Sequence, residues 1–269
     1  MSDRSLESNG PFAILFHTLF VSFIVAPLLI IVLVSFSDKG YISMPFDGAS
    51  WRWYKAIWDA PELINAFWLS VWLGLGAATI ASIVAVPAAI AIAKYRFAGR
   101  EALTSLILSP LMIPHVVLGV AFLRFFSVTG ISGSFIGLLL VHALIVTPYS
   151  LRLTLAAVIG IDRDAELAAR SLGASKYVSF WKVLFPLILP GVAGGWLLAF
   201  IQSFDEVTMT IFVSTPGTTT LPVALYERIA LMTDPVTTSV STVMIVGTMI
   251  LMFLLDRIVG LDKVLIGKK

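Results

Sequence analysis

The spacing of charged residues leaves six long, strongly apolar intervals along this chain. About 20 apolar residues cross a bilayer core that is about 30 Å thick. Because lipid offers the backbone no hydrogen-bond partner, such intervals must be helical, and they are too long and too uniformly apolar for the alternating strands of a barrel. We therefore predict an all-α integral membrane protein. Its six spans lie near residues 12–35, 64–93, 102–123, 131–151, 183–204 and 236–255.

Composition excludes several other classes of protein. The chain has 269 residues, of which 58% are hydrophobic and 13% charged, and its mean hydropathy is +0.97. Soluble domains carry about 25% charged residues, so neither a water-soluble enzyme nor a disordered chain fits. The absence of cysteine excludes disulfides and thiolate metal sites. The net charge of +2 is too small to indicate nucleic acid as a partner.

The distribution of Lys and Arg predicts the orientation in the membrane. If the N-terminus is cytoplasmic, 13 of the 18 basic residues lie in cytoplasmic segments and 5 in external ones, in agreement with the usual cytoplasmic excess of positive charge. Six spans also place both termini on one side. The first span exceeds the apolar run of about 7–15 residues in a removable signal peptide, so we expect it to be retained as a signal anchor. We expect residues 1–269 to form a single transmembrane domain.

Two prolines interrupt the third predicted span. Pro110 and Pro114 remove two backbone donors and clash with the preceding helical turn. Transporters use interrupted helices at membrane depth to line a cavity, although a packing kink explains the two prolines equally well. Two G-x-x-x-G patterns, at residues 133–137 and 191–195, would allow close contact between helices.

The cytoplasmic segment 152–182 has the pattern of two helices joined by a glycine. Asp162 or Asp164 can cap a short helix, Gly173 can adopt a positive φ after it, and Ser175 can cap a second helix. The alanine-lined face of the first helix could enter a groove on a partner, although an ordinary solvated loop also fits the composition. The basic side chains that could line the rim of that contact are Arg163, Arg170 and Lys176.

This segment resembles the EAA loop of permeases of type I binding-protein-dependent ABC importers. Ala168 and Ala169 match the two alanines of the family pattern, and Gly173 matches its glycine. After nine further residues, the stretch 183–186 stands at the position of the family's I-x-L-P element. The resemblance implies a type I ABC importer permease fold in which a helix of this loop couples to an ATPase. It assigns the contact with the ATPase to Glu166, Leu167, Ala168, Ala169, Arg170, Gly173, Ala174, Ser175 and Lys176.

The chain departs from the family pattern at two places. Leu167 stands where the first Glu of the motif usually lies, and Glu166 is one position earlier. Phe185 replaces the usual Leu. These changes affect one particular charge contact rather than the docking helix itself.

Other stretches resemble the spermidine/putrescine branch of the same family. They are Leu111–Pro114, Ser203–Glu206, Thr215–Gly217, Leu221–Pro222 and Tyr226. A member of this branch is a passive translocation subunit, which pairs with a second and usually different permease chain above two ATP-binding subunits. An extracytoplasmic binding protein delivers the solute. The resemblance therefore implies a multi-pass permease of the bacterial inner membrane, with cytoplasmic termini, for a polyamine such as putrescine or spermidine.

The sequence contains no phosphate-binding loop of the form G-x-x-x-x-G-K-[ST]. We therefore expect ATP and Mg to be bound by the partner ATPases and no cofactor in this chain. His17, His115 and His142 lie in different spans without the spacing of a zinc site, so we expect neither a metal nor catalytic residues. The alternative from another class is an ATP-independent secondary transporter, which would need coupling carboxylates within the spans and usually an internal repeat. The sequence shows neither feature.

Ionisable groups near the spans are candidates for the substrate pathway. Asp205 and Glu206 end the fifth span, and two adjacent carboxylates suit a cationic amine. Trp196 or Phe204 could add cation–π contact, whereas the alternative is an outer-end pair exposed to water. His115 stands where relatives in the polyamine branch often have an acidic residue. An imidazole there would also suit an amino-acid-like or other small organic solute.

Overall fold

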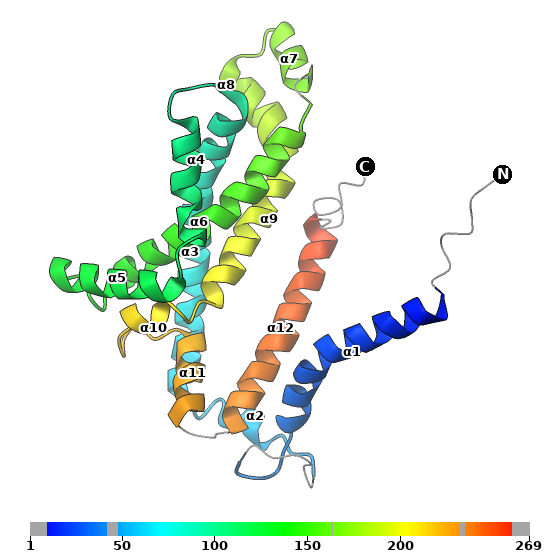
Figure 1. Cartoon of the computed structure of the whole chain (residues 1–269), viewed down its shortest axis with the longest axis vertical. Helices are drawn as coiled ribbons and strands as arrows, with labels where there is room; N and C mark the ends of the chain where they lie inside the picture. Colours follow the sequence, from blue (N-terminus) through cyan, green and yellow to red (C-terminus); the bar gives the residue numbers. More distant parts are fainter. Residues whose placement is uncertain (1–9, 42–47, 163, 232–234, 260–269) are drawn as a thin grey trace. The chain divides into compact units, whose positions relative to one another are not determined.

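The computed structural model describes residues 10–41, 48–162, 164–231 and 235–259 (Figure 1). Over these residues the regular elements are helical, apart from an isolated β-bridge between Ser37 and Ala49. The all-α prediction is therefore confirmed. In chain order the elements are α1 (Pro11–Val34), α2 (Arg52–Ala56), α3 (Pro61–Lys94), α4 (Arg100–Leu108), the 3-10 turn η2 (Ser109–Leu111), α5 (His115–Thr129), α6 (Phe135–Gly160), α7 (Asp164–Ser171), α8 (Lys176–Ser179), the π-helical turn η3 (Phe180–Leu184), α9 (Phe185–Phe204), α10 (Thr210–Val213), α11 (Leu221–Leu231) and α12 (Pro235–Val259).

Four helical segments among the described residues are long and apolar enough to cross a membrane. They are α1, α3, α6 and the continuous helix Lys176–Phe204, which contains α8, η3 and α9. The bent pair of α4–η2 and α5 would make a fifth crossing, and the apolar part of α12, Pro235–Ile250, is shorter. Four of the six predicted spans are thus single helices of sufficient length, and the third is broken. For the sixth, the apolar stretch found among the described residues of α12 is shorter than a full crossing.

The third predicted span is broken at its two prolines. η2 contains Pro110, Pro114 immediately precedes α5, and the two halves of the span meet at 97°. Neither proline has a backbone N–H to donate. The hydroxyl of Ser109 donates to the carbonyl of Leu106 (2.8 Å) at the end of the first half. The predicted interruption is confirmed, and it turns α5 away from the direction of α4.

Residues 62–226 belong to the larger of two compact units, and the pair α6 and α9 runs through it (Figure 1). The two helices approach closely because α9 has glycines on the shared face. A Cβ atom at Gly191 would lie 2.3 Å from the Cβ of Ala157, and one at Gly195 would lie 2.9 Å from the carbonyl oxygen of Ser150. The predicted close contact at residues 191–195 is therefore confirmed.

The other G-x-x-x-G pattern does not form a helix–helix seam. Gly133 lies in the turn before α6 with φ +74°, and a Cβ atom there would meet the side chain of Thr215. Gly137 is in α6, where its nearest neighbour is the ring of Phe126. The interpretation of residues 133–137 as a helix-packing motif is wrong, because the first glycine serves a turn that requires the left-handed region.

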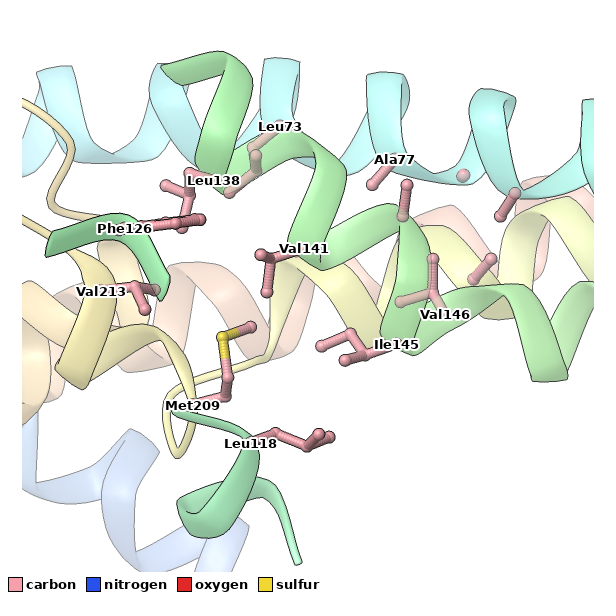
Figure 2. Close-up of a cluster of buried hydrophobic side chains, with 14 residues drawn as sticks. Leu73, Ala77, Leu118, Phe126, Leu138, Val141, Ile145, Val146, Met209 and Val213 are labelled. Carbon is pink, nitrogen blue, oxygen red and sulfur yellow. The ribbon is translucent and has the colours of Figure 1, made fainter. Parts of the chain in front are cut away.

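Side chains from several elements of this unit form a buried hydrophobic cluster (Figure 2). Leu73 and Ala77 come from α3, Val141 from α6, and Leu118 and Phe126 from α5. The segment around α10 contributes further apolar side chains. Although α5 leaves the line of α4, it is therefore fixed to the core of the unit by its own buried residues.

The smaller unit contains residues 1–61 and 227–252. Most side chains of α1 are exposed and apolar, as expected for a helix that faces lipid. After α1 the chain is held by polar contacts: the indole of Trp53 donates to the carbonyl of Ser37 (2.8 Å), and the hydroxyls of Ser35 and Tyr54 lie 2.6 Å apart. Ser239 of α12 donates to the carbonyl of Ser35 (3.3 Å).

The polar connection between the fourth and fifth spans is shorter than the predicted segment 152–182. α6 continues as far as Gly160, and a continuous helix begins again at Lys176. Arg152 is exposed on this extension while Leu151 and Thr154 are buried. The helix extends past the apolar run because one face of its last turns, which includes Leu151, Thr154 and Val158, is still buried.

Candidate functional site

The first candidate region is the helix–turn–helix after α6. α7 ends at a glycine turn in which Gly173 has φ +90°. The N–H of Ala174 donates to the carbonyl of Ala169 (3.1 Å), and the N–H of Gly173 donates to the carbonyl of Arg170 (3.0 Å). This is the hydrogen-bond pattern of a helix that stops at a left-handed glycine. The predicted helix, glycine turn and second helix are present.

Two of the predicted capping residues, Asp162 and Ser175, cap these two helices. The carboxylate of Asp162 accepts from the N–H of Asp164 (3.0 Å) at the start of α7. The hydroxyl of Ser175 accepts from the N–H of Val178 (3.2 Å) at the start of α8. Arg163, which we proposed as a rim charge, lies outside the described residues. Each helix is therefore capped by a side chain that directly precedes it in the sequence. The helix–turn–helix is thus specified by local residues.

Apolar side chains on this helix–turn–helix are turned outward. Leu172 is 90% exposed, and Leu167 and Tyr177 are also exposed. Ala168 is exposed, whereas Ala169 is half-buried against the unit. Exposed apolar patches commonly mark interaction surfaces. The segment thus exposes large apolar side chains to a partner, together with Arg170 and Lys176.

Glu166 differs from the other polar residues of α7 because its carboxylate points back to the unit. It pairs with the ammonium group of Lys94, the last residue of α3. The side chains of Lys94 and Glu166 are only 18% and 29% exposed. No local pattern in the sequence indicates this contact, because the partner is 72 residues away.

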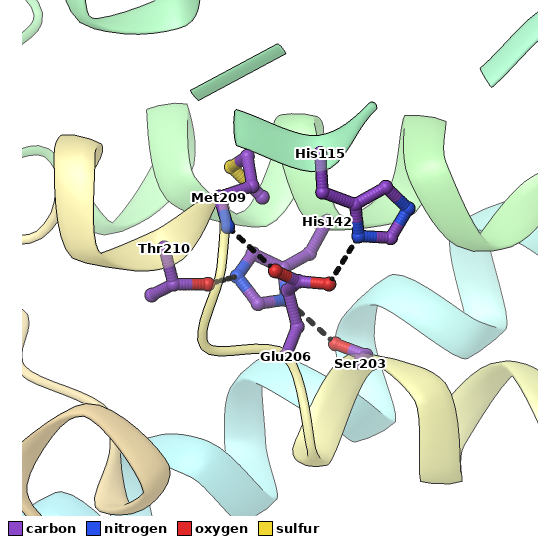
Figure 3. Close-up of polar contacts among 6 residues, drawn as sticks. All are labelled: His115, His142, Ser203, Glu206, Met209 and Thr210. Atoms are coloured by element: carbon purple, nitrogen blue, oxygen red, sulfur yellow. Dashed lines mark hydrogen bonds and ion pairs between the residues drawn. The ribbon is translucent and has the colours of Figure 1, made fainter. Parts of the chain in front are cut away.

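The second candidate region lies at the other end of α6 and α9. Glu206 follows α9, and its Oε2 lies 2.7 Å from Nδ1 of His115, the first residue of α5 (Figure 3). Its Oε1 accepts from the N–H of Met209 (2.6 Å). The side chain of Glu206 is 7% exposed and that of His115 is 30% exposed. The carboxylate therefore has a hydrogen bond at each oxygen within a largely buried site.

The two adjacent carboxylates that the sequence placed at this end have different environments. Asp205 is exposed on the surface of the unit, whereas Glu206 is buried. Partial desolvation raises the pKa of the Asp205 carboxyl above its usual value, and the charge of Glu206 adds to the shift. The structure thus brings Glu206 and His115 together and leaves Asp205 outside their contact.

A second histidine close to this pair was missed as a site residue by sequence reasoning. His142 of α6 is fully buried, with Nδ1 2.9 Å from the hydroxyl of Ser203 and Nε2 3.0 Å from the hydroxyl of Thr210 (Figure 3). These partners are 61 and 68 residues away in the sequence, so no local spacing could have indicated them. His142 joins α6 to both ends of the turn that holds Glu206.

The aromatic candidates on α9 pack against α3. Trp196 stacks on Phe200 with ring centroids 5.9 Å apart, and Phe200 lies at the same distance from Phe204. The indole of Trp196 donates to the hydroxyl of Thr79 (3.1 Å), and the ring of Phe204 contacts that of Phe67. The row of rings is therefore a packing feature of the α3–α9 contact, and a role for Trp196 or Phe204 in substrate binding stays a prediction.

Residues 81–261 match the model of a protein family described as the binding-protein-dependent transport system inner membrane component. Curated proteins are similar over most of the chain. The spermidine/putrescine transport system permease protein PotC of Haemophilus influenzae is 35% identical over 233 residues, which cover 87% of this chain and 90% of the relative. The putrescine transport system permease protein PotI of Escherichia coli is 29% identical over 244 residues, with 88% and 86% covered.

Solved structures share the fold at low sequence identity. A chain of a bacterial ABC transporter involved in the import of the acidic polysaccharide alginate has a TM-score of 0.75 at 18% identity, over 96% of this chain and 99% of that one. A chain of the MetNI methionine ABC transporter in an inward-facing conformation has a TM-score of 0.63 at 19% identity, with 76% and 96% covered. The chain belongs to the family of binding-protein-dependent transport system inner membrane components, and it is a permease subunit of an ABC importer with the type I permease fold.

Proposed function

We propose that this permease carries a polyamine such as putrescine or spermidine into the cell. The observation that carries the proposal is the 35% identity to PotC, a spermidine/putrescine permease, over 87% of the chain. A largely buried carboxylate at the end of α9, that of Glu206, is consistent with a cationic substrate. A buried carboxylate and an ammonium group attract each other far more strongly than they would in water.

The chain works as one half of the translocation pathway in this proposal. A second permease, expected to be a different chain, forms the other half, and an extracytoplasmic binding protein delivers the solute. Two ATP-binding subunits bind ATP and Mg and supply the energy, while this chain holds no cofactor and hydrolyses nothing. Both termini lie in the cytoplasm, and the third of the six crossings is the broken pair of α4–η2 and α5.

Coupling to the ATPase takes place through α7, the glycine turn and the start of α8. The exposed side chains Leu167, Leu172 and Tyr177 support this assignment, because large apolar groups that are exposed on a helix–turn–helix are available to a partner. An amphipathic helix that lays such a face into a groove is a common mode of protein recognition. The residues assigned to this coupling segment are Glu166, Leu167, Ala168, Ala169, Arg170, Gly173, Ala174, Ser175 and Lys176. Among them, the carboxylate of Glu166 faces α3 of its own chain.

The substrate pathway passes the other end of α9. His115 and Glu206 carry the polar contact there, with Asp205 exposed beside them. Trp196 and Phe204 are retained as candidates for a cation–π contact with the substrate. In this arrangement the solute meets acidic groups at the point where the third span is broken.

An amino-acid-like or other small organic solute is the second candidate, and one specific observation favours it. His115 already lies against the carboxylate of Glu206. The pair combines an imidazole, which can donate to a carboxylate, with a carboxylate, which can accept from an ammonium group, and this combination matches a zwitterion better than a diamine. An ATP-independent secondary transporter, the alternative from another class, is tested by the same measurement.

The test is uptake into proteoliposomes that contain the full importer with its binding protein and ATP. Labelled putrescine, spermidine and a set of amino acids are compared, and vesicles with a non-hydrolysable ATP analogue serve as the control. The proposal expects ATP-dependent uptake of a polyamine. Saturable uptake of amino acids alone would overturn the assignment of the substrate, and uptake by the purified chain without ATPase subunits would overturn the mechanism.

A further inference from the structure

One ion pair connects the proposed coupling helix to a membrane-spanning helix of the same chain. Lys94 is the last residue of α3, and Glu166 lies in the first turn of α7. Each charge is at the helix end that favours it, because the C-terminal end of a helix attracts cations and the N-terminal end attracts anions. Both side chains are less than one-third exposed. The contact is therefore better shielded from solvent than an ordinary surface pair.

The position of Glu166 on α7 explains why its carboxylate is used inside the subunit. Successive residues of a helix are separated by about 100° around the axis. Glu166 and Ala169, three residues apart, are the half-buried positions of α7, whereas Leu167 and Ala168 are exposed. An acidic residue at position 167 would stand on the outward face. Because the acidic residue is at 166 instead, it faces α3.

The pair also lies at the wall of a small cavity where three helices meet. This cavity has a volume of about 100 Å³, and it is lined by Ala93, Lys94, Val158, Ile159, Ile161 and Glu166. Two of these residues come from the end of α3 and two from the last turns of α6. The ion pair is therefore a direct contact between α7 and α3 beside this cavity.

We propose that Lys94 and Glu166 are positioning residues that transmit the displacement of α7 to α3 during transport. This inference rests on the proposed docking of α7 to the ATPase. The outward face of α7 makes the contact with the motor subunit, and the inward carboxylate makes α3 follow the movement. Without the pair, α7 can remain docked while α3 lags behind, so that ATP is hydrolysed without full movement of the pathway.

The experiment compares Lys94→Met, Glu166→Gln and the double charge swap Lys94→Glu with Glu166→Lys in the intact importer. Solute uptake and ATP hydrolysis are measured in the same proteoliposomes. Each single variant is expected to lower the number of solutes carried per ATP by roughly three- to five-fold, as loss of a partly shielded pair allows. Lys94→Met, which lies outside the coupling segment, is expected to keep the ATPase subunits bound and to retain basal hydrolysis. The charge swap is expected to recover most of that loss. The exposed residues Arg96 and Glu101 provide matched controls, since Arg96→Met and Glu101→Gln remove the same charges nearby.

A second variant keeps the test decisive if a single substitution disturbs folding. The chain has no cysteine, so Lys94→Cys with Glu166→Cys gives this subunit two thiols and no others. A short reducible cross-linker can join them. Coupling is expected to return when the cross-link forms and to fall again on reduction. Normal coupling in both single variants, or no recovery from either the swap or the cross-link, would overturn the inference.

Failure of the proposed docking gives a different result. Leu172→Asp places a charge on the outward apolar surface and is expected to release the ATPase from the purified complex. If the ATPase stays bound to that variant and uptake is normal, α7 is not the docking element, whatever the ion-pair variants do. If Leu172→Asp releases the ATPase but the ion-pair variants couple normally, the docking proposal stands and the Lys94–Glu166 inference fails.

Discussion

Glu206, which follows α9, is paired with His115 at the break in the third span, with 2.7 Å between Oε2 and Nδ1. The two residues are 91 positions apart in the sequence. Pro114 sets the position of His115 at the start of α5, and the end of α9 sets that of Glu206. The interruption of one membrane helix and the termination of another are thus joined by a single polar contact.

Replacing Glu206 by Gln removes the charge from this contact and leaves its shape nearly unchanged. We expect KM for a cationic substrate to rise by roughly ten-fold or more, because loss of one charged interaction of about 1.4 kcal/mol corresponds to ten-fold in affinity. Uptake kinetics in proteoliposomes measure this. The exposed Glu227 provides the control, and Glu227→Gln should leave KM unchanged. Equal KM values for the Glu206 and Glu227 variants would contradict the assignment of Glu206 to the pathway.

The glycine contact between α6 and α9 should tolerate no side chain. In Gly195→Ala the new Cβ would lie 2.9 Å from the carbonyl oxygen of Ser150, which is backbone and cannot rotate away. We expect a loss of stability of about 1–3 kcal/mol, as in other overpacked cores. The thermal unfolding midpoint of the purified complex reports it. Gly247→Ala is the matched control, since nothing lies within 4 Å of that position, and an unchanged midpoint in both variants would refute the close approach.

Gly173 should be replaceable only by residues that accept a positive φ. Its φ of +90° strains most side chains, although a Cβ atom there would meet nothing within 4 Å. We expect Gly173→Asn to support uptake and Gly173→Trp to uncouple ATP hydrolysis from uptake. The measurement is ATPase activity stimulated by the loaded binding protein, together with uptake. Gly160→Trp, at another uncrowded glycine, controls for bulk alone; equal coupling in Gly173→Trp and the unaltered chain would argue against the turn as a coupling element.

Replacement of His142 by Leu should destabilise the turn between α9 and α10. Both hydroxyls that contact the imidazole, those of Ser203 and Thr210, are buried. A buried polar group without a partner costs about 1–3 kcal/mol, so the variant should unfold at lower temperature. Removing the hydroxyls as well, with Ser203→Ala and Thr210→Val, should recover part of the loss. No recovery in the triple variant would show that packing, rather than hydrogen bonding, explains the effect.

Local features of this fold were predictable from the sequence because their causes are local. Apolar runs fixed the positions of α1, α3, α6 and α9, and two prolines indicated the break before α5. The turn at Gly173 was predictable for the same reason, since a glycine after a capped helix needs only its neighbours to form.

Contacts between distant segments were not predictable, because they depend on how each helix is rotated about its axis. The sequence placed Asp205 and Glu206 together as equivalent carboxylates, yet one is exposed and the other buried. The partner of Glu166 likewise could not be found without knowing that it faces α3. The glycines at 133 and 137 show the reverse error, since a pattern that matched a packing motif forms a turn instead.

The close approach of α6 and α9 has a mechanical consequence. Gly191 and Gly195 bring the backbone of α9 against Ala157 and Ser150 of α6, so at these two positions no long side chain can absorb a displacement. α7 lies at one end of this helix pair (Figure 1). The Glu206–His115 contact follows the other end of α9. A displacement of the end that carries the turn at Gly173 is therefore passed along the α6–α9 contact with little slack at these two positions.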